Sequence, residues 1–597
     1  MTTKSKTLLG RASSAVAMST VAFSLLVIVP SSAVAQSSSD PQFKVQLNFN
    51  RWHDYDELKV DLLRLEDAFP QFLNYQSIGT TAGGRDMMLM TINNPATGPE
   101  ASKAAMFIDA NMHGNEIQGG EVCLYTIWYL MENYGRIDKV TQLVDERVFY
   151  IMPTVNPDGR DFFMDGTGQG GRTGHVPVDD DNDGLFDEDG PEDLNGSGAV
   201  EQIRKYVPGQ GTHRISHRDH RILEPVPPGE TGDYVLLGNE GLDNDGDGMV
   251  NEDGPGGYDQ NRNWGAGWQP SYVQNGAMDY PFQLPASRAE ADFMMAHPNI
   301  AGLQTYHNSG GMILRGPGST WHGTFPTSDI RVYDELGENA ERMLPYYDYM
   351  TFWFGLYTAH GAFVDWANDA LGVVAFLNEL WAGGQYFNSP DLQAQQQDPD
   401  SPISEDRASY FFNDFLEFGD QYVEWQEFEH PQLGLVEMGG WKKTTRRLPP
   451  RFMNEELAHR NMAFTLHLAD EMPLMRMGET TVERISSDVF KVSIDLINDK
   501  VMPTILARAA SNNVITPDLL IVDGAAEVIS AGFVENKFMP GPSQMIDQND
   551  LERIMIRNGH PGRTTRTVEY LMRGSGNVTV RYVSVKGGTV ETRVSLR

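Results

Sequence analysis

The sequence lacks several residues and motifs that carry chemistry in other proteins. Cys123 is the only cysteine among 597 residues, so no internal disulfide can form. It also lies in an apolar helical pattern typical of a core residue, which sets cysteine chemistry aside. The motifs His-Glu-x-x-His, Gly-x-Ser-x-Gly and Gly-x-x-x-x-Gly-Lys are absent. These absences exclude the zincin helix, the serine nucleophile elbow and the phosphate-binding loop.

Long apolar runs are missing after residue 35. Residues 1–35 begin with basic side chains, continue with an apolar run and end in Ala-Val-Ala. This is typical of a secretory signal peptide that is cut after Ala35. No later segment offers the roughly 18 uninterrupted apolar residues that a transmembrane helix needs. We therefore expect a secreted or periplasmic protein with no membrane span.

Positive charge is also scarce. The 46 lysines and arginines face 82 aspartates and glutamates, which gives a formal net charge of −36. A nucleic-acid-binding protein needs a basic face to neutralise phosphates, so we expect no nucleic-acid partner. Cations are the expected partners of so acidic a chain. The composition places no constraint on the oligomeric state.

Helical and strand patterns alternate across residues 36–478, which we take as one large domain. Strands that alternate with helices predict an α/β fold with a doubly wound, mostly parallel sheet and helices on both faces. In such a sheet, functional residues gather at the carboxyl ends of the strands. His113, His307 and Glu379 all lie at predicted strand ends.

Residues 479–597 have a different pattern. Short β-type runs such as "DVFKVSIDLI" and "NVTVRYVSV" are separated by Gly, Asn and Asp. This pattern predicts a small C-terminal β-sandwich domain. Because it contains no motif that carries chemistry, we expect a stabilising or surface-binding accessory domain.

An acidic insertion, about residues 165–258, contains two copies of one pattern. "DDDNDGLFDEDGP" (179–191) and "DNDGDGMVNEDGP" (243–255) both read Asp-x-Asp-x-Asp-Gly. Alternating carboxylates with a glycine at the bend surround a hard cation in the first half of an EF-hand loop. The pattern predicts calcium binding by Asp179, Asp181, Asp183, Asp243, Asp245 and Asp247. A solvated acidic loop without an ion is the alternative.

Two residues of "FIDANMHGNEIQGGE" (107–121), His113 and Glu116, are candidate metal ligands. Alone, a His-x-x-Glu pair is a weak signal, because chance should produce about one in such a chain. A zinc site for hydrolysis needs three protein ligands and one open position. His307, in "LQTYHNSGG", is the candidate third ligand.

Six short motifs follow one another along the chain: "HGNE", "VNPDG", "QNRNW", "TYHNSGG", "LYTAHGAFVDW" and "FLNEL". In this order they resemble the zinc carboxypeptidase family of the carboxypeptidase A type, over roughly residues 50–470. The resemblance implies that His113, Glu116 and His307 bind zinc.

The resemblance also implies roles for other residues. Asn261 and Arg262 would grip the terminal carboxylate of the substrate, which suits a planar bidentate donor. Tyr357 would close over the bound residue. Glu379 would take a proton from zinc-bound water and deliver it to the leaving amine. Glu437, in "LGLVEMGG", is a rival for this base but lacks the family spacing after the tyrosine motif.

Two further assignments depend on the resemblance. The family has an arginine that polarises the scissile carbonyl, a short stretch before the Asn-Arg pair. Arg204 in "QIRK" is the best match, and Arg214, Arg218 and Arg221 remain open. Val364 occupies the place that faces the C-terminal side chain of the substrate, which favours apolar or aromatic C-termini.

The sequence therefore predicts a secreted zinc metallocarboxypeptidase that removes residues from peptide or protein C-termini. A peptidoglycan stem-peptide peptidase or amidase on the same scaffold is one alternative. A calcium-stabilised, non-catalytic binding protein is the other. The second alternative is disfavoured because every expected role has a chemically suitable residue.

Overall fold

The computed structural model describes residues 43–597 except 169, 180–182, 218, 384–404, 446, 536–537, 539–541 and 543. Residues 45–597 form one compact unit. The expected signal peptide (1–35), Asp181 and Arg218 lie outside the described residues. In the part of the chain that is described, no helix has the length and apolar character required to cross a membrane.

An eight-stranded mixed sheet carries the site, with the strand order β1-β2-β4-β3-β9-β12-β10-β11. The strands are β1 (Leu73–Thr80), β2 (Asp86–Ile92), β3 (Ala104–Ala110), β4 (Arg147–Met152), β9 (Ile300–Asn308), β10 (Met312–Arg315), β11 (Asp348–Thr351) and β12 (Val374–Leu380). The central strands β4, β3, β9 and β12 are parallel to one another. Every residue of β3, β4 and β9 is buried, as expected of parallel strands covered on both faces.

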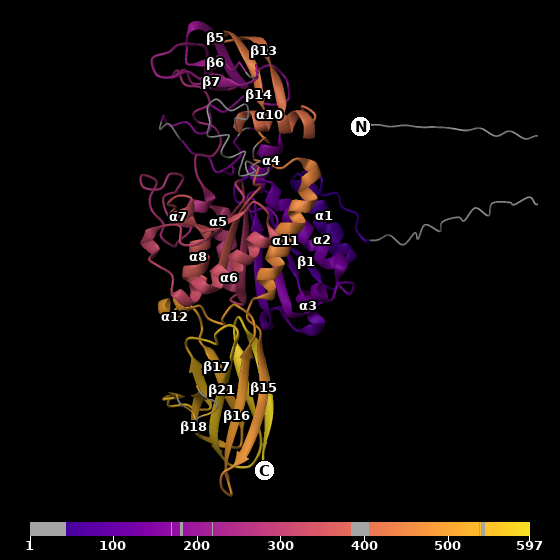
Figure 1. Cartoon of the computed structure of the whole chain (residues 1–597), viewed down its shortest axis with the longest axis vertical. Coiled ribbons are helices and arrows are strands. Elements are labelled where there is room, and N and C mark those ends of the chain that lie inside the picture. The colour runs from indigo at the N-terminus through magenta and orange to yellow at the C-terminus, as the bar shows by residue number, and fades with distance from the viewer. Residues whose placement is uncertain are drawn as a thin grey trace, which may run out of the picture. The chain divides into compact units, whose positions relative to one another are not determined.

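Helices cover both faces of this sheet (Figure 1). On one face, Tyr306 of β9 donates its hydroxyl hydrogen to the carbonyl of Asn461 in α11 (Asn454–Asp470), which packs on α2 (Gln118–Asn133). On the other, Leu303 of β9 shares a core with α5 (Pro285–Ala296) and α8 (Phe363–Leu371). Further helices described before the C-terminal strands are α1 (Tyr55–Ala68), α3 (Asp138–Glu146), α4 (Pro157–Met164), α6 (Thr327–Met343), α7 (Phe352–Gly355) and α10 (Glu405–Leu416). The predicted α/β fold is confirmed, with antiparallel pairs only toward the edges of the described sheet.

The acidic insertion contributes to a second sheet that the sequence analysis did not predict. This six-stranded sheet has the order β13-β14-β5-β8-β6-β7 (Figure 1). Its strands are β5 (Gln202–Gly211), β6 (His213–Ile215), β7 (Leu223–Pro225), β8 (Gly232–Asn239), β13 (Tyr422–His430) and β14 (Gly434–Trp441). We call it the accessory sheet. It joins segments that are more than two hundred residues apart, since β14 pairs with β5 and Glu437 lies opposite Arg204.

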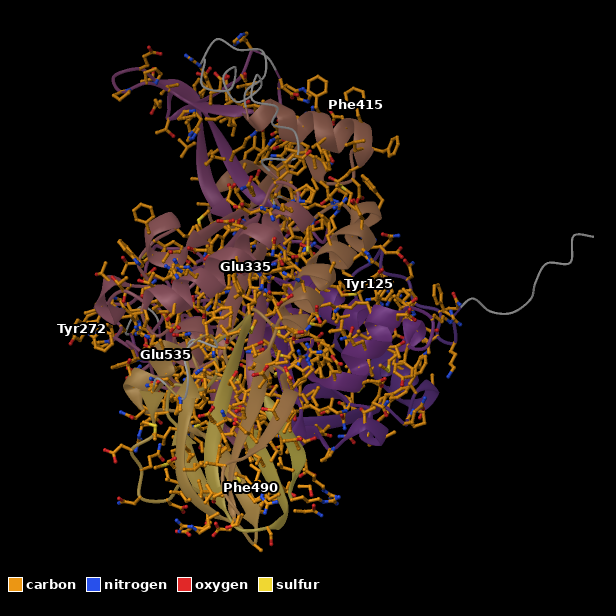
Figure 2. The ribbon with its side chains drawn as sticks, turned by 60° about the horizontal axis from the view of Figure 1, so that its bottom comes forward. Tyr125, Tyr272, Glu335, Phe415, Phe490 and Glu535 are labelled. Atoms are coloured by element: carbon orange, nitrogen blue, oxygen red, sulfur yellow. The ribbon has the colours of Figure 1, made fainter. Side chains whose placement is uncertain are left out.

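Residues 475–597, which we call the C-terminal β region, form two antiparallel sheets. The strands are β15 (Met475–Arg484), β16 (Val489–Asn498), β17 (Asp518–Gly524), β18 (Glu527–Val534), β19 (Gln544–Met545), β20 (Arg553–Ile556), β21 (Thr564–Arg573), β22 (Gly576–Ser584) and β23 (Gly588–Leu596), with α12 (Ala507–Asn512) between β16 and β17. Both sheets contribute to one core, which includes Phe490 of β16 (Figure 2) and Val580 of β22. The β-sandwich character predicted for this region is confirmed.

Candidate active site

Three buried side chains at the end of the central sheet form a candidate metal centre. His113 Nδ1 lies 3.0 Å from Glu116 Oε1, and His307 Nδ1 lies 2.9 Å from Glu116 Oε2. The two imidazole Nδ1 atoms are 3.1 Å apart. Two imidazoles and one carboxylate are a donor set that fits zinc and leaves a fourth position for a reacting group. The three ligands predicted from the sequence are therefore brought together.

Strand register explains why these distant residues meet. Strands β3 and β9 are parallel neighbours, with Ala110 opposite Tyr306. The loop after β3, which carries His113, therefore begins beside the end of β9. Strand β12 is the next neighbour of β9, and its pairing places Glu379 opposite His307. Backbone hydrogen bonding thus sets the separation between the metal ligands and the proposed base.

The environment of Glu379 favours its protonated form in the metal-free protein. Burial, reinforced by the Glu116 carboxylate, raises the pKa of Glu379 to about 8. A dication at the metal centre would oppose this shift because it stabilises a nearby carboxylate. Glu379 therefore has the perturbed proton affinity of a candidate acid–base residue.

Asp259 orients His113 through Nε2, the ring nitrogen that does not face Glu116. Its Oδ1 lies 2.9 Å from His113 Nε2, and its Oδ2 accepts a hydrogen bond from Arg172 Nη2 at 3.0 Å. Burial opposes ionisation, but His113, Arg262 and Arg172 together hold the pKa of Asp259 well below its ordinary value. A carboxylate in this position fixes the tautomer and ring orientation of a metal-binding histidine.

A buried arginine supports the loop that carries His113 and Glu116. Asn111 adopts a left-handed conformation, with φ of 58°, and its side-chain amide donates to the carbonyls of His113 and Gly114. Arg160 Nη1 in turn donates to Asn111 Oδ1 at 3.2 Å and to the carbonyl of Ile117 at 2.9 Å. The loop is therefore held by hydrogen bonds independently of any metal.

A cavity of ≈230 Å³ opens beside the metal centre. Besides the three metal ligands, its predicted lining residues are Asn261, Arg262, Tyr357 and Glu379. Its apolar lining consists of Met312, Phe352, Leu356 and Leu377. Two arginines that the sequence analysis did not single out, Arg172 and Arg447, also line it. The cavity thus combines cationic groups with one apolar wall.

Arg262 and Tyr357 lie together in this cavity. Arg262 Nη2 donates to the Tyr357 hydroxyl oxygen at 3.2 Å, and Arg262 Nη1 donates to the Asn261 carbonyl at 2.8 Å. Arg262 is only 5% exposed, whereas Tyr357 is 47% exposed. A buried guanidinium beneath an exposed phenol can bind an anionic group that enters the cavity, while the phenol is free to cover it.

Arg204 is not at this cavity, contrary to the sequence-based assignment. It lies in β5, where its Nε donates to Glu437 Oε2 at 2.5 Å. Its guanidinium also stacks on two rings of the accessory sheet, 4.7 Å from Tyr234 and 4.3 Å from Trp425. Arg204 and Glu437, the rival base, therefore stabilise the accessory sheet together.

Two of the other arginines left open, Arg214 and Arg221, are also placed elsewhere, and Arg218 lies outside the described residues. Arg214 pairs with Glu224 and Glu230, and Arg221 pairs with Asp219 and Asp414. Arg172, which belongs to the acidic insertion, contacts the metal centre instead. Its Nη1 donates to Glu116 Oε1 at 3.1 Å. The sequence signal that could have identified it is its position in "GGRTGH", just before the acidic repeats.

Arg447 reaches the metal centre from the segment between β14 and α11. Its Nη1 donates to the Asn308 carbonyl at 3.0 Å and lies 3.4 Å from Glu116 Oε1. The Asn308 amide donates back to the Arg447 carbonyl at 3.3 Å. No short motif marks this residue, because its place depends on the long-range pairing of the accessory sheet.

Val364 is a core residue and not a lining residue of the cavity. It is 2% exposed and packs in the same core as Trp264 and Phe363. It therefore does not face the cavity, as the resemblance had implied. The apolar wall consists instead of side chains from β10, β12 and the segment around α7.

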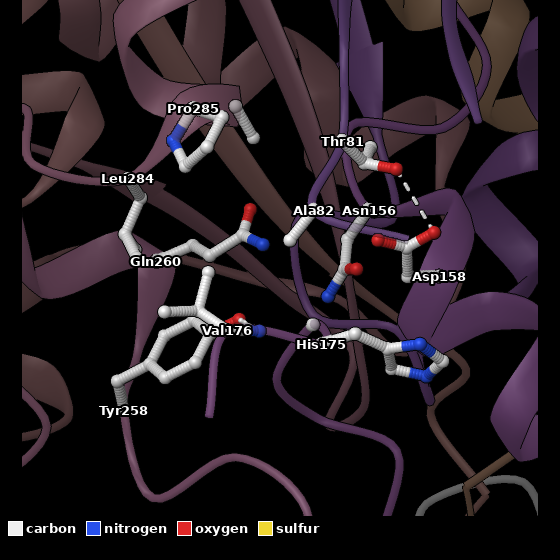
Figure 3. Close-up of a pocket in the computed structure, with 12 residues that line it drawn as sticks. Thr81, Ala82, Asn156, Asp158, His175, Val176, Tyr258, Gln260, Leu284 and Pro285 are labelled. Carbon is white, nitrogen blue, oxygen red and sulfur yellow. Dashed lines mark hydrogen bonds between the residues drawn. The ribbon is translucent and has the colours of Figure 1, made fainter. Parts of the chain in front are cut away.

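Another, very small cavity of ≈20 Å³ is lined by residues 174–176 and by Tyr258 and Gln260 (Figure 3). Asn156, Tyr258 and Gln260 are among its lining residues, and the Tyr258 hydroxyl oxygen accepts the N–H of Val176 at 3.2 Å. This volume suffices for about one water molecule and not for a peptide. Its walls join the segments that carry Arg172 and Arg262.

The two acidic repeats lie side by side. Asp189 and Asp253, which occupy equivalent positions in the repeats, form an antiparallel bridge. Side chains that could jointly hold an ion are Asp243, Asp245 and Asp247; Asp183, Glu188 and Asp245; and Asp189, Asp245 and Glu252. The Asp179 carboxylate accepts the N–H of Gly184 at 3.1 Å.

Comparisons with known proteins agree with the site. A family model described as zinc carboxypeptidase matches residues 60–188 and 237–401, and a model for a domain of unknown function matches 475–595. Carboxypeptidase D of Anas platyrhynchos is 33% identical over 124 residues, which cover 21% of this chain and 9% of that protein. A zinc carboxypeptidase of Saccharothrix mutabilis subsp. capreolus is 30% identical over 128 residues, 21% of this chain and 29% of that protein. The matches thus span less than a third of either relative.

Two solved structures are also similar. Carboxypeptidase A from Helicoverpa armigera has a TM-score of 0.40 and 19% identity, covering 58% of this chain and 67% of that chain. Thrombin activatable fibrinolysis inhibitor has a TM-score of 0.41 and 14% identity, covering 71% and 74%.

Proposed function

The chain belongs to the zinc carboxypeptidase family, and from that premise we propose that it is a zinc metallocarboxypeptidase that releases single residues from peptide C-termini. The observation that carries the proposal is the convergence of the His113, Glu116 and His307 centre with Glu379 and Arg262 around one cavity. We further propose that the protein is exported, because its first 35 residues have the pattern of a signal peptide.

His113, Glu116 and His307 would hold the zinc ion, which supplies Lewis-acid polarisation of the scissile carbonyl and of the attacking water. Glu379 accepts the proton of that water and delivers it to the leaving amine. Its place opposite His307 puts the carboxylate at the metal centre, as this transfer requires.

Arg172 is the residue that we assign to stabilising the negative charge that develops on the carbonyl oxygen. The assignment is supported by its place in the cavity lining and by its hydrogen bond to Glu116, one of the candidate metal ligands. A fixed cation aimed at developing charge lowers the barrier without reorganisation. Arg172 replaces Arg204 in this role.

Asn261, Arg262 and Tyr357 bind the free carboxylate of the last residue. This contact makes the enzyme an exopeptidase, since an internal peptide bond offers no carboxylate to Arg262. The side chain of the last residue then faces the wall formed by Met312, Phe352, Leu356 and Leu377. We therefore propose a preference for apolar or aromatic C-terminal residues.

We propose calcium as a second, structural ion. The paired acidic repeats concentrate carboxylates that repel one another, and a hard cation with oxygen ligands relieves this repulsion. The ion would hold the insertion in place and so support Arg172, which immediately precedes the repeats.

The test of the proposed function is digestion of unmodified and C-terminally amidated peptides, analysed by mass spectrometry together with metal analysis of the protein. We expect one zinc ion, sequential loss of single C-terminal residues and strong discrimination against the amidated peptides. His307→Ala should lose both zinc and activity. Release of internal fragments, or equal cleavage of amidated peptides, would replace the carboxypeptidase with an endopeptidase or amidase. Cleavage of stem peptides alone would support the peptidoglycan alternative.

A further inference from the structure

Helix α8 begins at the substrate-binding residues. The backbone N–H of Phe363, its first residue, donates to Asn261 Oδ1 at 2.9 Å. The Phe363 ring lies 4.2 Å from the ring of Trp264, which follows the Asn261–Arg262 pair. The backbone N–H of Trp264 in turn donates to the carbonyl of Gly361, just before the helix. The start of α8 is therefore the support behind the carboxylate-binding residues.

The other end of α8 is held by the C-terminal β region. Lys586, between β22 and β23, donates to the carbonyl oxygens of Leu371 at 2.8 Å and Gly372 at 2.6 Å. These carbonyls end the helix, where they have no partner within it, so the buried amine of Lys586 satisfies them as a hydrogen-bond donor. Lys586 is only 4% exposed, so its amine is committed to this contact.

A second contact from the same region reaches the last turn of α8. Arg508, in α12, forms an ion pair with Asp369 and donates to the carbonyl of His322 at 3.0 Å. The start of α12 is itself fixed, because Asp329 of α6 accepts the N–H groups of Ala507 and Arg508, both at 2.9 Å. The backbone of Arg508 is thus fixed by Asp329, and its side chain is paired with Asp369.

His322 links Asp369 to Asp365, which lies nearer the proposed substrate-binding residues. His322 Nδ1 lies 2.8 Å from Asp369 Oδ2, and its Nε2 lies 3.3 Å from Asp365 Oδ2. The side chains of His322 and Asp365 are each 1% exposed. Asp365 lies in the first turn of α8, so this buried chain of charged groups runs along the helix from its last turn to its first.

From Asp365 the connection reaches the loop that carries Tyr357. Both Asp365 oxygens accept the N–H of Gly318, at 3.1 and 2.9 Å. The Gly318 carbonyl accepts the N–H of Ala359 at 2.8 Å, and Ala359 lies two residues after Tyr357. The loop that covers the carboxylate-binding site is therefore tied, through α8, to Arg508.

We propose that the C-terminal β region is a positioning element for the substrate pocket, and that Arg508 and Lys586 are its positioning residues. The inference rests on the proposed carboxypeptidase function. A short helix moves as a unit, so releasing its last turn loosens the support of Asn261 and the Tyr357 loop. Substrate binding should weaken while the chemical step is spared, because the metal ligands and Glu379 belong to the β3, β9 and β12 ends.

The test compares Arg508→Gln and Lys586→Met with Arg581→Gln. Arg581 serves as the control because it forms an ion pair with Asp523 inside the C-terminal β region. For Arg508→Gln and Lys586→Met we expect KM to rise about threefold to tenfold, with kcat within about twofold of wild type. Zinc content should be unchanged, and the control should keep the wild-type KM. Arg508→Lys should restore part of the binding.

A double-mutant cycle tests whether Arg508 affects KM through its contact with Asp369. Asp369→Asn should raise KM as Arg508→Gln does, and the double variant should be no worse than either single variant, because the two residues act through one contact. Wild-type KM in folded Arg508→Gln and Lys586→Met, even with a lowered melting temperature, overturns the proposal. If those variants do not fold, Asp369→Asn and Arg508→Lys decide by the same criterion. A wild-type protein without peptidase activity would instead overturn the proposed function.

Discussion

At the scale of single residues, the proposed chemistry depends on Glu379, the one carboxylate among the described lining residues of the cavity besides the candidate metal ligand Glu116. Glu379→Gln keeps the shape of the side chain and removes the proton acceptor. We expect kcat to fall by about a hundredfold or more, with KM and zinc content little changed. Steady-state kinetics and metal analysis check this. A variant that retained wild-type kcat would exclude Glu379 as the base.

Arg204 and Arg172 give a matched pair of variants. The sequence assigned Arg204 to polarising the scissile carbonyl, and we propose Arg172 for this role from the structure. Arg172→Gln should lower kcat by about a hundredfold, because it removes the cation that we propose stabilises the developing oxyanion. Arg204→Gln should instead leave kcat near wild type and lower the melting temperature, since Arg204 pairs with Glu437 away from the cavity. If kcat falls for Arg204→Gln and not for Arg172→Gln, the sequence-based assignment was correct.

The contrast between these arginines shows which residues of the candidate site could be predicted from the sequence. His113, Glu116 and His307 were predictable because each lies beside a strand end within a short motif. Arg172 was not, because the two acidic repeats of the insertion separate it from the Asn-Arg pair that served as the landmark. Arg447 depends on the pairing of β14 with β5, and no local pattern encodes such a contact.

At the scale of elements, the paired acidic repeats should respond to calcium. A chelator with weak affinity for zinc should lower the melting temperature, and added calcium should restore it, because a ligand that binds only the native state stabilises that state. Asp245 contributes to all three candidate ion-binding groups, so Asp245→Asn should weaken the response. An unchanged melting temperature across the titration would leave the repeats as solvated acidic loops.

The elements themselves were predicted unevenly. The central strands were recognisable because they are buried along their whole length and read as apolar runs. The strands of the accessory sheet were not, because they are largely half-exposed; β8 has only one fully buried residue. Their pairing also joins the insertion to residues 422–441, and such a long-range contact leaves no periodic signal in either segment.

At the scale of the whole molecule, Lys586 should couple stability to pH. Burial lowers the pKa of Lys586 to about 7, below that of an unfolded lysine. Between pH 7 and about 10 the unfolded chain therefore binds more protons at this residue, so its contribution to the free energy of unfolding increases with pH, by up to about 1.4 kcal/mol per unit. Lys586→Met should lose this slope. Urea unfolding of both proteins at several pH values measures the difference, and parallel curves would contradict it.

We expect two cations of the cavity, Arg172 and Arg447, to depend on a single opening event in the accessory sheet. Arg172 precedes β5 and Arg447 follows β14, and these two strands are hydrogen-bonded neighbours. A local unfolding that separates them would withdraw both guanidinium groups while the central sheet keeps its metal ligands. Amide exchange in β5 and β14 should therefore report one cooperative unit. Under mild denaturant the protein would pass through a state that still holds zinc but has lost its catalytic power. The stability of the accessory sheet, and not that of the eight-stranded sheet, would then set the denaturant concentration at which activity is lost.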